Sequence, residues 1–567
     1  MRLTSQRSEE MFFPSPGEKL LNFDLEVAPR TGIGQVEINA AAGPVRTDYQ
    51  VEIDIRNPNP SVTESMGTLL EAGSEWETSF DPIGMPGTRR AVLELSDIPP
   101  LNLAQRLQYL ISFPHGCVEQ TVSAAFPQLY LSAVEELDEQ EQADVEANVK
   151  EAIRRLSSFR TNEGAFAYWP GSNDADEWST SYAGHFMLEA QQRGYFIPAG
   201  MLQGWISYQR RRALQWGRSL EYSREDLVQA YRLYTLALAG EVETGAMNRM
   251  REMSGVSSAA RWRLSAAYAL IGQNQVAESL INGLETQVEP YREAQGTYGS
   301  ALRDQAMILE TLGILQKRER GLTLFRTIAS ELASDAWLST QTTAFALIAT
   351  TKFAQGMELS EGINALVTID GQPAINLQSD LSVVQREIPV RSGEEQTLKV
   401  VNQGDGELYA RVVMEGQPAP GDEKVLTNGL RMNVVYKGTD GEVINISDLR
   451  QGTDFVAEVT VFNPGTAGDL NQLALTHVIP SGWEILNTRL LNLEAFNQQS
   501  AYEYQNIRDD RVYTYFDLPA GQRKTFALML NATYAGRFYL PAIYCESMYD
   551  NSINTGLSGQ WVEVVQP

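Results

Sequence analysis

The sequence Phe113-Pro114-His115-Gly116-Cys117-Val118-Glu119-Gln120 decides how the rest of this chain is interpreted. It contains one of only two cysteines in 567 residues, and a glutamine follows that cysteine three positions later. If a helical turn begins at Cys117, residues i and i+3 share one face, so the thiol and the Gln120 carboxamide come together. A thiolate that attacks this carboxamide expels ammonia and leaves an internal thioester. The stretch therefore predicts a stored acyl group between Cys117 and Gln120.

The eight residues together resemble the thioester motif of the alpha-2-macroglobulin and complement family, most closely that of its bacterial members. The similarity continues through Thr121-Val122-Ser123 and the pair Phe126-Pro127. Phe113 and His115 depart from the pattern, because bacterial relatives usually carry tyrosines at these positions. A C-x-x-Q spacing alone occurs by chance, and without the surrounding motif Cys117 would be interpreted as a small buried hydrophobic residue near a helix start.

Composition excludes several classes of protein. A length of 567 residues is typical of three or four domains. The net charge of −27 argues against partners with a phosphate backbone and against an anionic membrane surface. No apolar run approaches the roughly 20 residues of a membrane span. Two cysteines exclude a disulfide framework, and a Cys117–Cys545 bridge is not expected because it would abolish the thioester.

Hydrophobic periodicity divides the chain into five regions. Residues 1–20 form a polar lead-in from a preceding domain, and the alternating residues of 21–100 predict strands. A helical period with short loops runs through 101–355. Strands return in 356–420 and again, after a linker, in 425–567, where regular turn signals predict an antiparallel sandwich. The N-terminus has no signal-peptide core, and we expect this chain to be the C-terminal part of something longer.

These regions predict a multidomain fold of α and β parts. Paired helices joined by short loops favour an α/α toroid or solenoid. The strands of 356–420 are too few for a sandwich alone, so we expect one sandwich split by the helical insertion. The resemblance implies the same architecture: an α/α-toroid thioester domain inserted in a CUB-like β-sandwich, followed by a C-terminal macroglobulin-like β-sandwich. The aromatic residues of the loop 162–171 are expected to be core packing.

The resemblance implies a broad-spectrum protease inhibitor that traps attacking proteases. Cleavage of an upstream bait region would expose the thioester to lysine amines of the protease. Each molecule would react once, so it is an endopeptidase inhibitor and not an enzyme. Until then water must be excluded, and the resemblance implies that Phe113, His115, Met548 and Tyr549 shield the bond. The position of His115 also makes it a candidate acid or base.

Other candidate groups are interpreted as structural. Glu119 is expected to be a carboxylate favoured by the helix dipole. His185 reads as a satisfied structural histidine, and His477 as a surface strand residue. Neither stands where complement-type relatives carry a histidine that redirects the acyl group to hydroxyls, so direct transfer to amines is expected. The sequence contains no metal or cofactor motif.

Three alternatives to the trap stay open. One is a covalent adhesin or opsonin that uses the same bond, and another is a lapsed scaffold without a thioester. The third is an α/α-toroid enzyme, which would need carboxylates in its central cleft; the acidic residues Asp174, Asp176 and Glu177 are instead expected to be solvated turn residues. By resemblance we expect a monomeric, periplasmic, membrane-anchored lipoprotein in the full-length protein. A penicillin-binding protein is a further partner that the resemblance implies.

Overall fold

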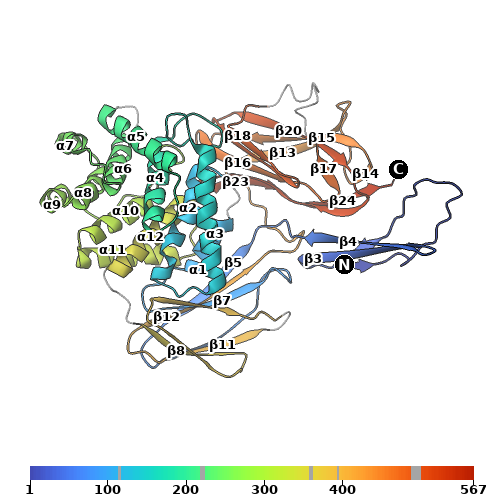
Figure 1. Cartoon of the computed structure of the whole chain (residues 1–567), viewed down its shortest axis with the longest axis horizontal. Coiled ribbons are helices and arrows are strands. Elements are labelled where there is room, and N and C mark those ends of the chain that lie inside the picture. Colours follow the sequence, from blue (N-terminus) through green and yellow to red (C-terminus); the bar gives the residue numbers. More distant parts are fainter. Residues whose placement is uncertain (113–115, 218–223, 357–361, 392–394, 487–499, 567) are drawn as a thin grey trace.

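The computed structural model describes the chain except for residues 113–115, 218–223, 357–361, 392–394, 487–499 and 567. Figure 1 shows a helical domain beside a sandwich of C-terminal strands, with a second sandwich below the helices and an N-terminal hairpin that projects to one side. Among the described helices, none combines the length and the apolar character needed to cross a membrane.

The helical domain is a double ring of described helices. The inner helices contact one another in sequence order, and the last of them contacts the first, so the ring closes. The inner ring consists of α2 (Val118–Ala125), α4 (Glu177–Gln192), α6 (Glu225–Leu238), α8 (Ser258–Leu270), α10 (Ala301–Ile314) and α12 (Thr340–Gly356). The outer ring consists of α1 (Leu103–Ser112), α3 (Glu139–Leu156), α5 (Ala199–Gln215), α7 (Thr244–Glu252), α9 (Asn274–Ile281) and α11 (Arg318–Ala333). Two short 3₁₀ helices, η1 (Pro127–Ala133) and η2 (Ser157–Phe159), flank α3.

Burial follows this arrangement. The inner helix α4 is buried on all sides from Trp178 to Ala190, which is the pattern of a helix surrounded by others. The outer helix α3 buries only Val149, Ala152, Ile153 and Leu156, which form one stripe, and it begins at an Asp138–Glu141 capping box. The α/α toroid expected from the helical period is confirmed.

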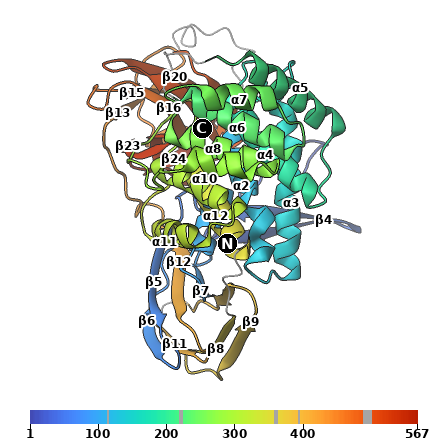
Figure 2. The same cartoon turned by 90° about the vertical axis from the view of Figure 1, so that its left-hand side faces the viewer.

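A sandwich of two four-stranded antiparallel sheets brackets the toroid. Three strands precede the helices: β5 (Val62–Leu70), β6 (Glu75–Phe80) and β7 (Arg90–Ser96). Five follow them: β8 (Ile363–Ile369), β9 (Ile375–Ser379), β10 (Val383–Ile388), β11 (Gln396–Asn402) and β12 (Leu408–Gly416). The strand orders β10-β7-β12-β5 and β6-β11-β8-β9 interleave the two sets. The helical domain is therefore inserted into one sandwich, which Figure 2 shows below the helices.

The C-terminal strands form a further sandwich with three sheets. Their orders are β13-β15-β20-β17, β18-β19-β16-β22-β23 and β14-β24-β21. The strands are β13 (Arg431–Gly438), β14 (Asp448–Arg450), β15 (Asp454–Phe462), β16 (Leu470–Val478), β17 (Trp483–Ile485), β18 (Tyr504–Ile507), β19 (Arg511–Leu518), β20 (Arg523–Ala532), β21 (Gly536–Leu540), β22 (Ile543–Ser547), β23 (Asp550–Leu557) and β24 (Gln560–Val565). The five-stranded sheet faces the toroid, and the turn between β22 and β23 carries Met548 and Tyr549 toward it.

The region before the first sandwich differs from the expectation. Residues 21–100 were expected to be its first half, but β3 (Gly32–Ala42) and β4 (Val45–Ile55) pair only with each other among the described strands. They form a hairpin that projects away from the rest of the chain (Figure 1). The short strands β1 (Arg2–Leu3) and β2 (Leu25–Glu26) pair beside it. The alternating pattern of this region predicted strands correctly, but strand pattern does not specify which sheet a strand joins.

Candidate functional site

Cys117 and Gln120 lie on the first turn of the inner helix α2. Cys117 is the N-cap residue, and its Sγ accepts a hydrogen bond from the Gln120 backbone N–H at 3.5 Å. A side chain in this role satisfies one of the N–H groups that a helix start leaves without partners. Cys117 is 0% exposed and Gln120 is 3% exposed. The helix start therefore puts Cys117 and Gln120 on one helical turn, where both side chains are almost completely buried.

Two contacts from other elements fix this helix start. The Val118 backbone N–H donates to the Tyr168 carbonyl at 3.1 Å, and Arg155 on α3 donates to the Gly116 carbonyl at 2.9 Å. A β-carbon at Gly116 would lie 2.1 Å from the Arg155 guanidinium, so only glycine allows this hydrogen bond without displacing the arginine. The backbone on both sides of Cys117 is thus held by the toroid.

The Gln120 carboxamide is an exception to the rule that buried polar groups are hydrogen-bonded. Neither its Oε1 nor its Nε2 has a hydrogen-bond partner in the described part of the chain. A buried polar group without a partner costs about 1–3 kcal/mol. Conversion to a thioester would remove the amide N–H donors with the departing ammonia.

An aromatic cover from two domains lies over this site. Tyr549 and Met548 of the C-terminal sandwich are 3% and 1% exposed and belong to the hydrophobic core of the toroid. The Tyr549 hydroxyl contacts the Tyr168 hydroxyl at 2.7 Å. The ring of Tyr298 lies 5.0 Å from that of Tyr168 and 5.1 Å from that of Tyr549. The structure therefore brings the predicted residue Tyr549 to the site together with Tyr168 and Tyr298, and buries Met548 next to Tyr549 in the same core. Their shielding role stays a prediction.

The surroundings make a free thiol at this position unreactive. Burial, with a smaller contribution from the nearby Glu119 carboxylate, raises the pKa of the Cys117 thiol to about 12, although the hydroxyls of Tyr168 and Tyr549 act to lower it. Since the thiolate is the nucleophile, an attack on Gln120 requires a group that removes the thiol proton.

Glu119 lies in the first turn of α2, as expected of a carboxylate favoured by the helix dipole, but it also makes buried contacts. It is 0% exposed, and its carboxylate accepts hydrogen bonds from Ser123 at 2.6 Å, from Thr340 at 3.0 and 3.2 Å, and from Tyr549 at 2.9 Å. Burial raises its pKa to about 7, although these hydrogen bonds lower it. The interpretation of Glu119 from the sequence missed this because nothing in the motif indicates that a residue of a distant domain meets it.

Trp169 anchors the contact between the toroid and the C-terminal sandwich. Its ring stacks on Tyr504 at 5.0 Å and lies 4.2 Å from Tyr515. Its Nε1–H donates to Glu503 at 3.2 Å. The side chain was expected to be core packing, and its core spans both domains. The loop that carries it depends on Gly164, whose φ of 90° and close approach to Gly204 exclude a side chain.

Polar contacts surround this aromatic centre. Arg292 forms an ion pair with Asp550 at 3.1 Å, and Gln295 donates to Asp517 at 3.4 Å. Both pairs join the toroid to the sandwich and are partly exposed. Such contacts contribute about 0–1 kcal/mol each, so the buried aromatic residues carry most of the free energy that keeps the domains together.

The remaining predicted residues have mixed outcomes. Phe113 and His115 lie outside the described residues. Cys117 and Cys545 are not joined by a disulfide bond. His477 was expected on the surface, which is wrong: it is 4% exposed, and burial lowers its pKa to about 4. The alternating pattern of β16 does not reveal this, because both faces of that strand are covered.

The acidic loop before α4 is also more structured than expected. Asp174 is exposed, as a solvated turn residue should be. Asp176, however, is the N-cap of α4 and accepts a hydrogen bond from the Tyr298 hydroxyl at 2.7 Å. Glu177 pairs with Arg212 at 2.8 Å. Asp176 thereby orients one of the tyrosines that cover Cys117.

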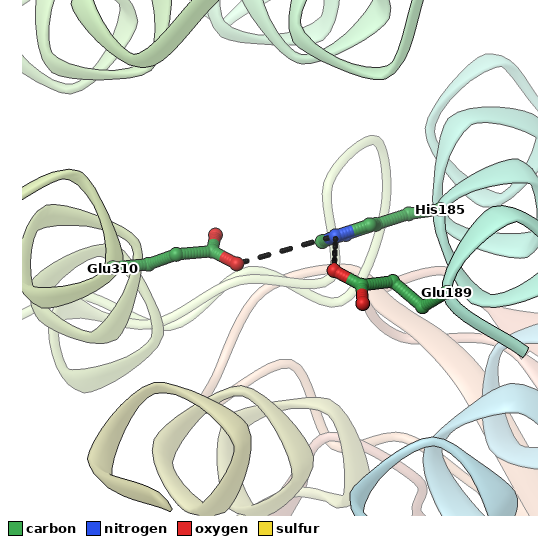
Figure 3. Close-up of side chains that lie close together, drawn as sticks. All are labelled: His185, Glu189 and Glu310. Atoms are coloured by element: carbon green, nitrogen blue, oxygen red, sulfur yellow. Dashed lines mark ion pairs between the residues drawn. The ribbon is translucent and has the colours of Figure 1, made fainter. Parts of the chain in front are cut away.

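A separate cluster of charges lies inside the toroid. Figure 3 shows His185 and Glu189 of α4 facing Glu310 of α10, at a spacing that is compatible with a metal site. His185 Nε2 lies 3.4 Å from Glu189 and 4.0 Å from Glu310. The same two carboxylate oxygens, however, bind the Lys352 ammonium at 2.6 and 2.8 Å, and Arg263 binds Glu310 at 2.7 Å. The cation position is filled by lysine, so we interpret the cluster as a buried charge network that joins four inner helices.

Two buried carboxyls predict how stability depends on pH. Burial raises the pKa of Glu119 to about 7 and that of Glu135 to about 8, from 4.5. Between pH 4.5 and the raised pKa of each group, the folded state therefore binds more protons than the unfolded state. The free energy of unfolding consequently falls as the pH rises through this range. We expect the free energy of unfolding of the helical domain, followed by circular dichroism in urea, to fall by at most about 3 kcal/mol for Glu119 and about 5 kcal/mol for Glu135. Glu119→Gln should remove the decrease in stability that the unmodified chain shows up to about pH 7. Glu135→Gln should remove the decrease that extends to about pH 8. If neither substitution changes the dependence of stability on pH, these two ionisable groups are not buried as described.

Comparisons with known proteins agree with this architecture. The model of the A-macroglobulin TED domain matches residues 93–368, and that of the bacterial alpha-2-macroglobulin MG10 domain matches residues 429–551. Alpha-2-macroglobulin of Escherichia coli K12 is 27% identical over an alignment of 583 residues, which covers 94% of this chain and 34% of the relative. The protein of Xylella fastidiosa Temecula1 is 25% identical, with coverages of 97% and 35%. The chain thus spans about a third of the length of the curated relatives it matches.

This chain also superposes on solved structures of bacterial alpha-2-macroglobulins. Native E. coli alpha-2-macroglobulin from domain MG7 to the C-terminus superposes with a TM-score of 0.79 at 25% identity, covering 95% of this chain and 88% of that one. Salmonella alpha-2-macroglobulin reacted with methylamine gives a TM-score of 0.80 at 24% identity, covering 95% and 36%, and shows the shared fold. The resemblance drawn from the motif is confirmed.

Proposed function

Because this chain belongs with the bacterial alpha-2-macroglobulins and corresponds to their C-terminal portion, we propose that it carries the reactive part of a covalent protease trap. Cys117 and Gln120 form an internal thioester, which the C-terminal sandwich keeps from water. When the two domains separate, the acyl group of residue 120 is transferred to a lysine amine of the attacking protease. Each molecule reacts once.

The observation that supports the thioester most is the environment of Cys117 and Gln120. The two side chains start from one helical turn, are almost completely buried, and the Gln120 carboxamide has no hydrogen-bond partner in the described structure. A glutamine selected only for structure would be expected to find partners or solvent. The same dry position favours a thioester, which has no N–H donor to satisfy and which survives only where water is excluded.

The chemistry balances without a cofactor. In the first step the Cys117 S–H and the Gln120 carboxamide give a C–S bond and one molecule of ammonia. In the second step an amine forms a C–N bond with the same carbonyl carbon, the C–S bond breaks, and Cys117 recovers its thiol proton. The products are an amide at residue 120 and a free thiol.

The position of the aromatic cover provides the trigger. Tyr549 and Met548 belong to the C-terminal sandwich, whereas Cys117 and Gln120 belong to the toroid. Any movement that separates the two domains removes half of the cover in one step. We propose that cleavage of a bait region, outside the portion of the relatives that this chain matches, causes this movement.

Transfer to amines is the preferred reaction. His185 Nδ1 is bound to Tyr231 at 3.0 Å within the charge network, and His477 is buried in the C-terminal sandwich. Neither is placed to form an acyl-imidazole with residue 120, the intermediate that would redirect the acyl group to hydroxyls.

Periplasmic location, a lipid anchor and a penicillin-binding protein as a partner remain proposals that rest on the family resemblance.

Uptake of methylamine tests this proposal. We expect the chain to incorporate one methylamine at residue 120 and to release one thiol, as measured by peptide mass mapping and thiol titration. Cys117→Ser should abolish both, whereas the matched variant Cys545→Ala should retain both, because Cys545 lies in the separate core of the C-terminal sandwich. Absence of uptake in the unmodified chain, or equal uptake by the Cys117 variant, would overturn the proposal.

A further inference from the structure

Shielding of the buried Cys117 site does not explain how protons move while the thioester forms. Formation of the thioester requires removal of the thiol proton and protonation of the leaving nitrogen, because an amide anion is not expelled as such. Both events must occur in a buried site. The described residues contain a set of hydrogen-bonded side chains that lies beside the thiol and ends at a carboxyl group.

The connection passes through two tyrosine hydroxyls. Tyr168 and Tyr549 both lie close enough to the Cys117 thiol to lower its pKa. Their hydroxyl oxygens lie 2.7 Å apart, and the Tyr549 hydroxyl donates to Glu119 Oε2 at 2.9 Å. Thr340 and Ser123 hold the Glu119 carboxylate in place from two inner helices. The observed hydrogen bonds therefore run from Tyr168 through Tyr549 to Glu119, beside the Cys117 thiol, and both Cys117 and Glu119 are fully buried.

We propose that Tyr549 and Glu119 handle the protons during thioester formation, so that the domain that protects the bond also helps to make it. This inference rests on the proposed function. The thiol proton passes through the tyrosine hydroxyls to the Glu119 carboxylate as Sγ attacks the Gln120 carbonyl carbon. In the tetrahedral intermediate the nitrogen and Sγ are bonded to the same carbon, so the tyrosine hydroxyls beside Sγ return the proton from the carboxylic acid to that nitrogen. The C–N bond then breaks and ammonia leaves. No oxidant, reductant or metal is required.

The geometry favours this role over simple packing. A carboxyl group in contact with a tyrosine would be an unfavourable choice for an apolar interface, because burying a charge without a cation is costly. The titratable groups that act on Glu119 include Tyr549 and Asp176, and neither is a cation. Because no cation among these groups fixes Glu119 in its charged form, its carboxyl group can gain and lose a proton. Proton transfer by a positioned side chain accelerates reactions by about 10²–10⁴-fold.

A consequence is that the bond forms only after docking. Tyr549 reaches Glu119 and Tyr168 only when the C-terminal sandwich lies on the toroid, since it belongs to the turn between β22 and β23. The reactive bond would then not be made in a partly folded chain whose site is open to water.

The test measures bond formation directly after refolding of the whole chain. Samples are quenched with acid over time, and peptide mass mapping distinguishes three forms of residue 120: the original glutamine, the thioester, and the glutamate that hydrolysis leaves. The sum of the last two reports formation, even if the bond is later lost. We expect Glu119→Gln and Tyr549→Phe each to slow formation by about 100-fold.

Controls separate this role from a structural one. Glu135→Gln removes another buried carboxyl with a raised pKa, at the contact with the lower sandwich, and should form the bond at the unmodified rate. In the unmodified chain the rate should rise with pH through about 7, because the carboxylate form of Glu119 accepts the proton, and Glu119→Gln should lose this dependence. Circular dichroism confirms that each variant is folded.

The outcomes distinguish the two proposals. If the unmodified chain retains glutamine at residue 120 throughout, the proposed function itself fails. If the unmodified chain forms the bond and Glu119→Gln forms it equally fast with the same pH dependence, the thioester stands and the role of Glu119 is wrong. If only Tyr549→Phe is unaffected, the relay through Tyr549 is wrong.

Discussion

Replacement of Trp169 by alanine is expected to raise the rate at which water and methylamine reach the Cys117–Gln120 bond by about 100-fold. Trp169 is 6% exposed, stacks on Tyr504 and Tyr515 of the other domain, and donates a hydrogen bond to Glu503. Loss of a buried tryptophan costs about 3–5 kcal/mol, and each 1.4 kcal/mol is about tenfold in an equilibrium. The population with separated domains should rise accordingly.

Release of the Cys117 thiol over time measures this rate. Trp561→Ala is the matched control, because Trp561 belongs to the same sandwich but is 51% exposed. Its thiol should appear at the unmodified rate. Equal rates in the two variants would show that the contact between the domains does not protect the bond.

Replacement of Lys352 by methionine is expected to destabilise the helical domain by about 3–5 kcal/mol, since removal of one partner leaves buried charges uncompensated. Lys352 binds Glu189 at 2.6 Å and Glu310 at 2.8 Å, and both carboxylates are nearly inaccessible to water. Burial acts to raise the pKa of both carboxyls. The Lys352 ammonium, together with His185 and, at Glu310, Arg263, nevertheless holds these pKa values below the usual range.

Urea unfolding followed by circular dichroism measures this effect. Lys150→Met removes a lysine from the exposed pair with Glu146 and should change stability by less than about 1 kcal/mol. The double variant Lys352→Met with Glu189→Gln should recover part of the loss, because one uncompensated charge is then absent. A Lys352 variant as stable as the unmodified chain would mean that the network is not compensated by this lysine.

The sequence predicted the order and type of the domains well, because they depend on local periodicity. The hydrophobic residues of 101–355 recur with the period of a helix, and this region is helical. The strands before and after it were correctly assigned to one split sandwich. The hairpin of 32–55 shows the limit, since an alternating pattern predicts a strand but not its neighbours.

The site was predictable only in part. Cys117 and Gln120 are three positions apart, so a helical turn that begins at Cys117 puts them on one face. Met548 and Tyr549 followed from the resemblance. Tyr168, Tyr298 and Glu119 were not assigned to the site, because each meets it through a contact over a long sequence separation, such as the 430 residues between Glu119 and Tyr549.

His477 and Asp176 show why single residues were misjudged. A histidine on an alternating strand was expected to face solvent, but the strand has neighbours on both faces. Asp176 was expected to be a solvated turn residue, but it begins α4 and orients Tyr298. In both cases the decisive information is tertiary packing, which overrides the local preference.

The mass of the intact, untreated chain tests the central claim most directly. The account predicts a mass lower than that calculated from the sequence by one molecule of ammonia, with Cys117 unreactive toward thiol reagents until the chain is unfolded or treated with methylamine. A full mass, with glutamine at residue 120 and a Cys117 thiol that was never acylated, would contradict it.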